Sequence, residues 1–161
     1  MYKQYTIRKG KNKPSSFNFV LSGKKHKKYA VAFILPEDCW YKVSNGSDDF
    51  NRIFGVQFGK GYWELEWIPA YYKTGVIELY ALVADGNIID RKLIGEIKIN
   101  KPYSLMVELD GKKWWFTCLD IGAFVDLPDR DIYTKLQFRK LPRINTKRKE
   151  DLTLFVEFNS M

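Results

Sequence analysis

Two glutamates in the segment YWELEW have a spacing that could support acid–base chemistry. Glu64 and Glu66 are separated by one residue, so both side chains would point to the same face of a β-strand. A retaining glycosidase requires two carboxyl groups about 5–5.5 Å apart. Ile68 and Pro69 follow, however, and no third acid extends the pattern. The pair is therefore interpreted as two solvent-facing glutamates, and the protein is predicted not to be an enzyme.

A histidine-dependent catalytic triad would have to use His26, the sole histidine of the chain. This residue lies among four lysines, at positions 24, 25, 27 and 28. Their charge disfavours the imidazolium that a general base must form. The sequence also lacks the glycine pattern of a phosphate-binding loop before a helix. These observations reinforce the prediction of a protein without catalytic activity.

The residues that could hold a metal are few and poorly spaced. Cys39 and Cys118 lie in apolar segments without the spacing of a zinc or redox motif, and we expect two free, buried thiols. Asp48 and Asp49 could join backbone carbonyls around a calcium ion, but two adjacent acids are a weak signal. The sequence therefore predicts no metal and no cofactor.

Positive charge dominates the composition, with 27 lysines and arginines against 19 aspartates and glutamates and a net charge of +8. The cations cluster at residues 8–13, 24–28 and 139–149, which are interpreted as solvated turns and protected sheet edges. Nucleic-acid binding is less favoured, because no recognised motif accompanies the charge. The first residues lack the apolar core of a signal peptide, and the longest apolar run, residues 29–36, is far shorter than a membrane span. We expect a protein made in the cytoplasm without a signal peptide, and no membrane partner.

Apolar segments of strand length, separated by turn residues, follow one another along the chain without helical periodicity. This spacing predicts an all-β fold, an antiparallel sandwich or barrel, as a single domain over residues 1–161. One short helical turn is expected near residues 47–52, and an extended basic loop or arm at 139–151. The predicted strands span residues 5–8, 17–22, 29–35, 53–58, 62–68, 76–84, 88–99, 103–109, 112–119, 133–138 and 152–158.

The segment YSLMVELDGKKWWFTCL predicts a β-hairpin, because Asp110-Gly111 suits a two-residue turn between alternating strands. Such a turn would pair Val107 with Trp114, which places this tryptophan in the core. Met106 and Trp115 then share the opposite, outward face. The same alternation in residues 62–67 predicts two core tryptophans, with the two glutamates on the other face.

Three motifs together resemble an uncharacterised family of bacterial β-sandwich proteins. Members share a Tyr-x-Ile-x-Lys-Gly start, an Asp-x-Asn-(Lys/Arg)-(Leu/Ile)-Phe-Gly element, and a strand of the form Ile-Glu-(Ile/Leu)-Tyr-Ala followed by a glycine. The matching positions are Tyr5, Ile7, Lys9 and Gly10; Asp49, Asn51, Arg52, Ile53, Phe54 and Gly55; and Ile77, Glu78, Leu79, Tyr80, Ala81 and Gly86. After Gly59 the chain departs from the family, which there has polar residues leading into a Gly-Trp strand. The resemblance implies a jelly-roll or concanavalin-like sandwich and no established activity.

Two binding functions remain. The favoured one is a structural or assembly protein, a phage virion accessory component of the capsid or tail that contacts protein neighbours, because virion proteins need no signal peptide. The alternative is a carbohydrate-binding, lectin-like module with a glycan as its partner, which stacks sugars on outward aromatic rings while Glu64 and Glu66 accept hydrogen bonds from sugar hydroxyl groups. The candidate binding residues for these functions are Trp115, Met106, Tyr62, Glu64, Glu66, Tyr80, Lys147, Arg148 and Lys149.

Overall fold

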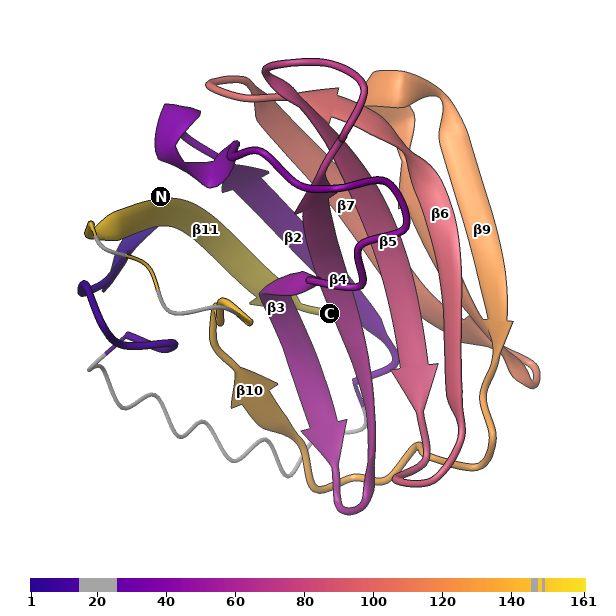
Figure 1. Cartoon of the computed structure of the whole chain (residues 1–161). Coiled ribbons are helices and arrows are strands. Elements are labelled where there is room, and N and C mark those ends of the chain that lie inside the picture. Colours follow the sequence, from indigo (N-terminus) through magenta and orange to yellow (C-terminus); the bar gives the residue numbers. More distant parts are fainter. Residues whose placement is uncertain (15–25, 146–147, 149) are drawn as a thin grey trace.

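The computed structural model describes residues 1–14, 26–145, 148 and 150–161. These residues form two antiparallel sheets, one with strand order β1-β11-β2-β7-β8-β9 and one with order β10-β3-β4-β5-β6 (Figure 1). The strands are β1 (Lys3–Ile7), β2 (Lys28–Ile34), β3 (Asn51–Phe58), β4 (Gly61–Pro69), β5 (Val76–Ala84), β6 (Ile89–Lys98), β7 (Pro102–Asp110), β8 (Lys113–Cys118), β9 (Ala123–Pro128), β10 (Phe138–Lys140) and β11 (Leu152–Ser160). The prediction of an all-β sandwich is confirmed.

The core lies between the two sheets and is rich in aromatic residues. Trp63 and Trp67 of β4 and Trp114 of β8 are fully buried, as the alternation in the sequence predicts. Alternate residues of each strand point into this core, so the residues between them form the outer faces of the sheets. The outer face of the five-stranded sheet therefore presents Tyr62, Glu64 and Glu66.

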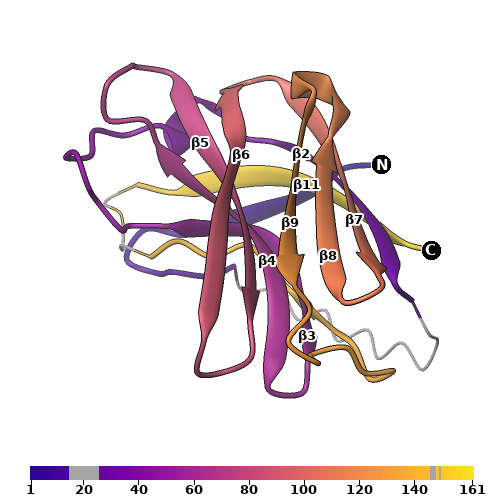
Figure 2. The same cartoon turned by 90° about the vertical axis from the view of Figure 1, so that its right-hand side faces the viewer.

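The two sheets approach each other along one side, where β6 and β9 lie next to each other (Figures 1 and 2). Lys92 of β6 forms an ion pair with Asp126 of β9 across this side, with 3.5 Å between the charged atoms. On the opposite side, the short strand β10 lies at the edge of the five-stranded sheet, and β1 lies at the edge of the six-stranded sheet.

The β7–β8 hairpin forms as predicted, but its register differs by two residues. Asp110 pairs with Lys113, and Val107 pairs with Phe116 rather than with Trp114. The turn begins at Gly111, whose φ of 62° favours glycine. Because the side-chain period of a strand is two, this shift leaves the faces unchanged.

The predicted elements differ from the observed ones in three places. Residues 47–50 form no helical turn; Ser47 accepts a hydrogen bond from the Asp49 amide at 3.3 Å, and extended chain follows from residue 51. The two 3-10 turns lie instead at Glu37–Cys39 and Leu119–Ile121. Strand β9 is missing from the prediction, and residues 133–137 are irregular where a strand is predicted. The strand predicted at 17–22 lies outside the described residues.

Both cysteines are buried and unpaired, as predicted. Of the predicted basic loop at 139–151, residues 139 and 140 belong to β10, and residues 146, 147 and 149 lie outside the described part of the chain. Within the described residues, no helix is long and apolar enough to cross a membrane. The assignment of residues 1–161 to one domain stays a prediction.

Candidate functional site

A cavity of about 270 Å³ lies on the outer face of the five-stranded sheet. Its floor is formed by charged and polar side chains from strands β3, β4, β6 and β10, and segments 48–50 and 143–145 form its rim. The floor residues are Arg52, Tyr62, Glu64, Glu66, Arg91 and Lys140. We call this cavity the outer-face site.

The pairing of the strands explains how residues distant in sequence meet here. Gly55 of β3 pairs with Lys140 of β10 on one side and with Glu64 of β4 on the other. Directly opposite residues point to the same face of a sheet. Because Gly55 has no side chain, nothing lies between Lys140 and Glu64 on this face of the sheet. The Lys140 ammonium therefore reaches the Glu64 carboxylate, at 2.5 Å.

Glu64 is buried, with 6% of its surface exposed, and is bound by two cations. Arg52 Nη1 donates to its Oε1 at 2.8 Å, and Lys140 Nζ lies 2.5 Å from the same oxygen. Burial alone would raise the pKa of the carboxyl group, but these two cations outweigh it and hold the pKa below its ordinary value. Glu64 is therefore an anion at neutral pH.

Glu66 lies on the same face and is 7% exposed. Arg91 of β6 donates to it through Nε at 2.7 Å and through Nη2 at 3.5 Å. Burial raises the pKa of Glu66, and the neighbouring Glu64 raises it further, against the lowering effect of Arg91. Two adjacent carboxyl groups thus have pKa values shifted in opposite directions.

Lys140 connects the ion pairs to an aromatic ring. Its ammonium lies 3.3 Å from the ring centroid of Tyr62, in a cation–π contact. Burial lowers the pKa of Lys140, while Glu64 raises it and the nearby Arg52 and Arg143 lower it again. One face of the Tyr62 ring is consequently covered by the protein itself.

The segment before β3 crosses the outer face of the five-stranded sheet (Figure 1), and its residues Asp48 and Phe50 line the outer-face site. Phe50 in this segment packs over Arg91, with 4.0 Å from the guanidinium to the ring centroid. It also meets the ring of Tyr80 edge to face, with centroids 4.9 Å apart. These contacts fix the position of Arg91 against Glu66.

Asn51 is buried and holds two parts of the rim in place. Its Nδ2 donates to the hydroxyl group of Tyr41 at 2.8 Å, and its Oδ1 accepts from the amide of Asn145 at 3.0 Å. A single amide side chain therefore links the segment before β3 to the segment after β10. Asn51 therefore positions these two segments relative to each other.

Arg143 lies at the rim of the site and has no counterion among the described residues. Its backbone exchanges hydrogen bonds with Arg52, at 2.7 and 3.0 Å, which places the two arginines side by side. Arg52 is engaged by Glu64 and by the carbonyl of Leu141. The Arg143 side chain is exposed and forms no hydrogen bond or ion pair with any other residue that the structure describes. It is available to an anionic ligand.

The structure brings together only some of the residues predicted to bind a ligand. Tyr62, Glu64 and Glu66 line one cavity, and Tyr80 lies beside it under Phe50. Trp115 and Met106 belong to the six-stranded sheet, where Trp115 packs on Phe124 with centroids 6.1 Å apart.

Of the predicted basic positions, only Arg148 lies within the described part of the chain. Its guanidinium lies 5.1 Å from the ring centroid of Tyr41 and donates to the carbonyl of Asp38. Lys147 and Lys149 lie outside the described residues.

The description of Glu64 and Glu66 as solvent-facing is wrong. Both point outward, but Arg52, Lys140 and Arg91 cover and neutralise them. Arg91, Lys140 and Arg143 are absent from the residues that the sequence suggests for binding. The sequence shows Lys140 and Arg143 only as part of a basic cluster, which does not reveal that Lys140 pairs with Glu64.

In the described part of the chain, no group of three or more His, Cys, Asp or Glu residues could hold a metal ion. Within the outer-face site, the two glutamates already have basic partners. The Glu64 and Glu66 carboxylates of this site are therefore already bound by cations of the protein itself.

No protein-family model matches this sequence, and no curated protein matches it either. Solved structures with the same fold include the alginate lyase from Klebsiella pneumoniae, with a TM-score of 0.65, 9% identity and 84% of this chain covered. The chain spans 59% of the length of that lyase. The alginate lyase AlyC3 in complex with dimannuronate has a TM-score of 0.58 and 12% identity, with 99% of this chain and 74% of the lyase covered.

The ancestral congerin Con-anc is also similar, with a TM-score of 0.50, 10% identity, and 96% of this chain and 98% of the congerin covered. At these identities the likeness defines the fold alone. The protein is a β-sandwich of the jelly-roll-like type found in alginate lyases and in this congerin.

These comparisons correct two predictions. The assignment to a phage virion accessory protein is contradicted, because the similar structures include alginate lyases and fit the carbohydrate-related alternative better. The prediction of a protein that is not an enzyme is contradicted for the same reason. The first prediction rested on the expectation that virion proteins need no signal peptide, and the second on reading Glu64 and Glu66 as solvent-facing, whereas both glutamates lie in a cavity of paired ions.

Proposed function

We propose that the protein binds a carbohydrate chain in the outer-face site. The observation that carries this proposal is the floor itself, in which Glu64 and Glu66 are held in fixed positions by Arg52, Lys140 and Arg91. Sugar hydroxyl groups both donate and accept hydrogen bonds. A floor that presents carboxylate acceptors next to guanidinium donors can satisfy both roles without rearrangement.

Polar contacts, rather than ring stacking, are expected to dominate recognition. The ring of Tyr62 is covered on one face by Lys140, and that of Phe50 by Arg91. The lectin-like alternative from the sequence combined stacking on outward rings with hydroxyl hydrogen bonds to Glu64 and Glu66. In the outer-face site, hydroxyl groups bound by charged side chains take over the role of stacking.

The charge of the site favours an acidic sugar. Among the residues that line the cavity, four cations (Arg52, Arg91, Lys140, Arg143) face three acids (Asp48, Glu64, Glu66). Arg143 at the rim has no counterion among the described residues. A guanidinium binds a carboxylate through two parallel hydrogen bonds, so a uronate would supply the missing partner.

The comparisons support this proposal to a limited degree. One of the proteins with the same fold was solved with dimannuronate bound, and both mannuronate units carry a carboxylate. The resemblance to the uncharacterised bacterial β-sandwich family, with its Asp49-to-Gly55 motif, stays a prediction and assigns no ligand.

Cleavage of the bound chain is a second candidate function. It is favoured by the opposite directions in which the pKa values of Glu64 and Glu66 are shifted. In such a pair Glu66 takes up its proton at a higher pH than Glu64, which would divide the roles of acid and base between them. Hydrolysis and elimination both need that division of roles, and either would act on the same ligand.

Isothermal titration calorimetry with oligosaccharides of equal length tests the binding function. We expect an oligouronate to bind at least about tenfold more tightly than its neutral counterpart. Replacing Arg143 with glutamine should remove most of that preference. Arg130→Gln is the matched control, because Arg130 pairs with Asp90 outside the site and its loss should leave binding unchanged.

The same mixtures of protein and oligosaccharide can be analysed for cleavage products. Elimination creates an unsaturated uronate that absorbs ultraviolet light, whereas hydrolysis creates new reducing ends without that absorbance. Binding without formation of either product would show that the protein binds the carbohydrate and does not cleave it. Equal affinities for the acidic and neutral oligosaccharides would refute the acidic-sugar assignment, and binding of neither would refute the proposed function.

A further inference from the structure

A second cavity, distant from the outer-face site, lies on the open side of the sandwich. It has a volume of about 240 Å³, and its walls come from the start of the chain, β10 and β11. Its lining includes Lys3, Tyr5, Arg139, Val156 and Phe158. We call it the edge cavity.

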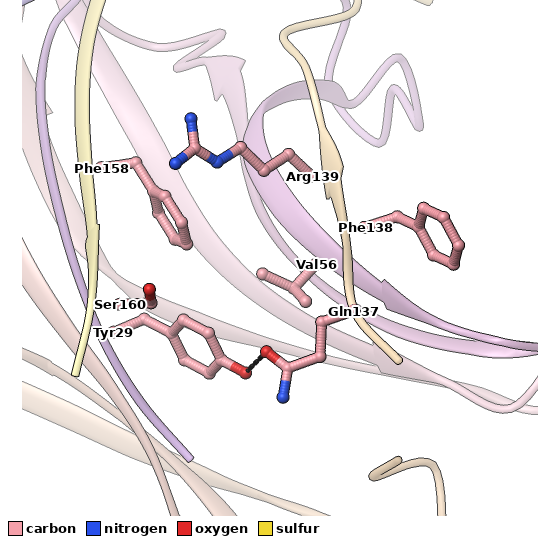
Figure 3. A pocket seen from close by; sticks show the side chains of 7 residues that line it. All are labelled: Tyr29, Val56, Gln137, Phe138, Arg139, Phe158 and Ser160. Carbon is pink, nitrogen blue, oxygen red and sulfur yellow. Dashed lines mark hydrogen bonds between the residues drawn. The ribbon is translucent and has the colours of Figure 1, made fainter. Parts of the chain in front are cut away.

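Arg139 reaches the edge cavity because it points away from its neighbours on β10. Successive side chains of a strand alternate between faces, so Lys140 reaches the outer face while Arg139 points between the sheets. Figure 3 shows Arg139 directed toward Phe158 and Phe138 directed the other way. On the far side of Arg139, a small space of about 30 Å³ is bordered by Tyr29 and Gln137, which share a hydrogen bond of 2.5 Å.

The guanidinium of Arg139 has no polar partner among the described residues. It stacks on the ring of Phe158 with 4.9 Å from its central carbon to the ring centroid. Stacking leaves the N–H donors around its edge free to bind an anion. By contrast, Arg52, Arg91 and Arg130 each pair with a carboxylate.

A second cation lines the same cavity. Lys3 lies over the ring of Tyr5, with its ammonium 5.3 Å from the centroid, and it has no ion pair with any residue that the structure describes. The acid in the lining, Glu157, is already paired with the amino group of Met1 at 2.8 Å. The edge cavity thus combines two cations without counterions in a mostly polar lining to which Val156 and Phe158 also contribute.

We propose that the edge cavity binds a small organic carboxylate, with Arg139 as the bidentate partner and Lys3 as the second cation. The planar fork of a guanidinium matches the two oxygens of a carboxylate. Val156 and Phe158 can contact the carbon part of the ligand, and the volume of about 240 Å³ limits it to a small molecule such as a single ring with one carboxylate. The carboxylate can belong to a free acid or to a sugar acid.

NMR titration of the full chain tests this site with benzoate, glucuronate and inorganic phosphate as probes. We expect the side-chain Nε–H signal of Arg139 to shift with a carboxylate, and the Kd to rise at least about tenfold in Arg139→Gln. Benzoate and glucuronate distinguish a free acid from a sugar acid as the source. Lys3→Gln, at the exposed start of β1, should weaken binding without any effect on folding.

Arg143→Gln is the control, because it belongs to the outer-face site and should leave these affinities unchanged. Wild-type affinity in Arg139→Gln, or no shift of Arg139 with any probe, would overturn the proposal. Equal affinity for phosphate and the two carboxylates would overturn the assignment of a carboxylate. None of these results bears on carbohydrate binding in the outer-face site, which is tested separately with the Arg143→Gln variant.

Discussion

Gly55 and Glu64 lie directly opposite each other on β3 and β4, and the Glu64 side chain passes over Gly55. A Cβ atom at residue 55 would lie 3.0 Å from Cγ of Glu64 and 2.5 Å from the carbonyl oxygen of Trp63. Gly55→Ala should therefore displace β4 and lower the free energy of unfolding by about 1–3 kcal/mol. Urea denaturation measures this change.

Gly95→Ala is the matched control for that substitution. A Cβ at residue 95 would meet only the end of the Ile121 side chain, at 2.8 Å, and this side chain can move. The alanine there should cost less. An equal or larger loss in Gly95→Ala would show that Glu64 and Gly55 are not tightly packed.

Glu64→Gln should destabilise the protein more than Glu66→Gln. The first change leaves both Arg52 and Lys140 without their carboxylate in a largely buried position, which costs about 3 kcal/mol. The second leaves only Arg91, which is partly exposed and stacked on Phe50. Urea midpoints of the two variants compare the costs, and a larger loss in Glu66→Gln would contradict the arrangement.

The two carboxyl groups should also respond differently to pH. The pKa of Glu64 is lowered, so its stabilising contribution is present at neutral pH and is lost as the pH falls through that lowered value. The pKa of Glu66 is raised, so its contribution is present in acid and is lost as the pH rises through that raised value. Carbon-13 titration of the side-chain carboxyl groups should show Glu66 taking up its proton at the higher pH.

Trp114→Ala should be far more harmful than Trp115→Ala. Trp114 is fully buried, and its Nε1 donates to Asp129 at 2.7 Å, so its truncation should cost about 3–5 kcal/mol. Trp115 lies on the outer face, against Phe124 and Lys113. Similar urea midpoints for the two variants would contradict the observed faces of β8.

A chelator should leave the thermal midpoint unchanged. The described residues contain no group of three or more potential metal ligands, and the acids of the outer-face site are paired with arginine and lysine. Differential scanning calorimetry with and without EDTA checks this expectation. A drop of several degrees would reveal a structural metal.

The sequence predicts faces better than it predicts partners. The alternation around Trp63 and Trp67 places both tryptophans in the core, as observed, because a strand has a period of two. The same period explains why the shifted register of the β7–β8 hairpin still buries Trp114. Strand β9 was missed because Asp126 and Pro128 interrupt its apolar pattern.

The ion pairs of the outer-face site could not be read from the sequence. Glu64 meets Lys140, and Glu66 meets Arg91, through strand pairings that no local pattern specifies. The sequence shows Gly55 only as the last residue of a motif and does not reveal that the Glu64 side chain packs against it. When only the sequence is known, charged residues on the outward face of a strand are predicted to be exposed to solvent, because the neighbouring strands that could supply their partners are not known.

The three residues of β10 make both candidate sites depend on the length of the preceding loop. Deleting or inserting a single residue there would move the strand by one position and exchange its two faces. Lys140 would then leave Glu64, and Arg139 would leave Phe158. Such a mutation would remove the carbohydrate site and the carboxylate site together. An insertion or deletion in residues 134–137 could therefore not be selected for its effect on one site without loss of the other.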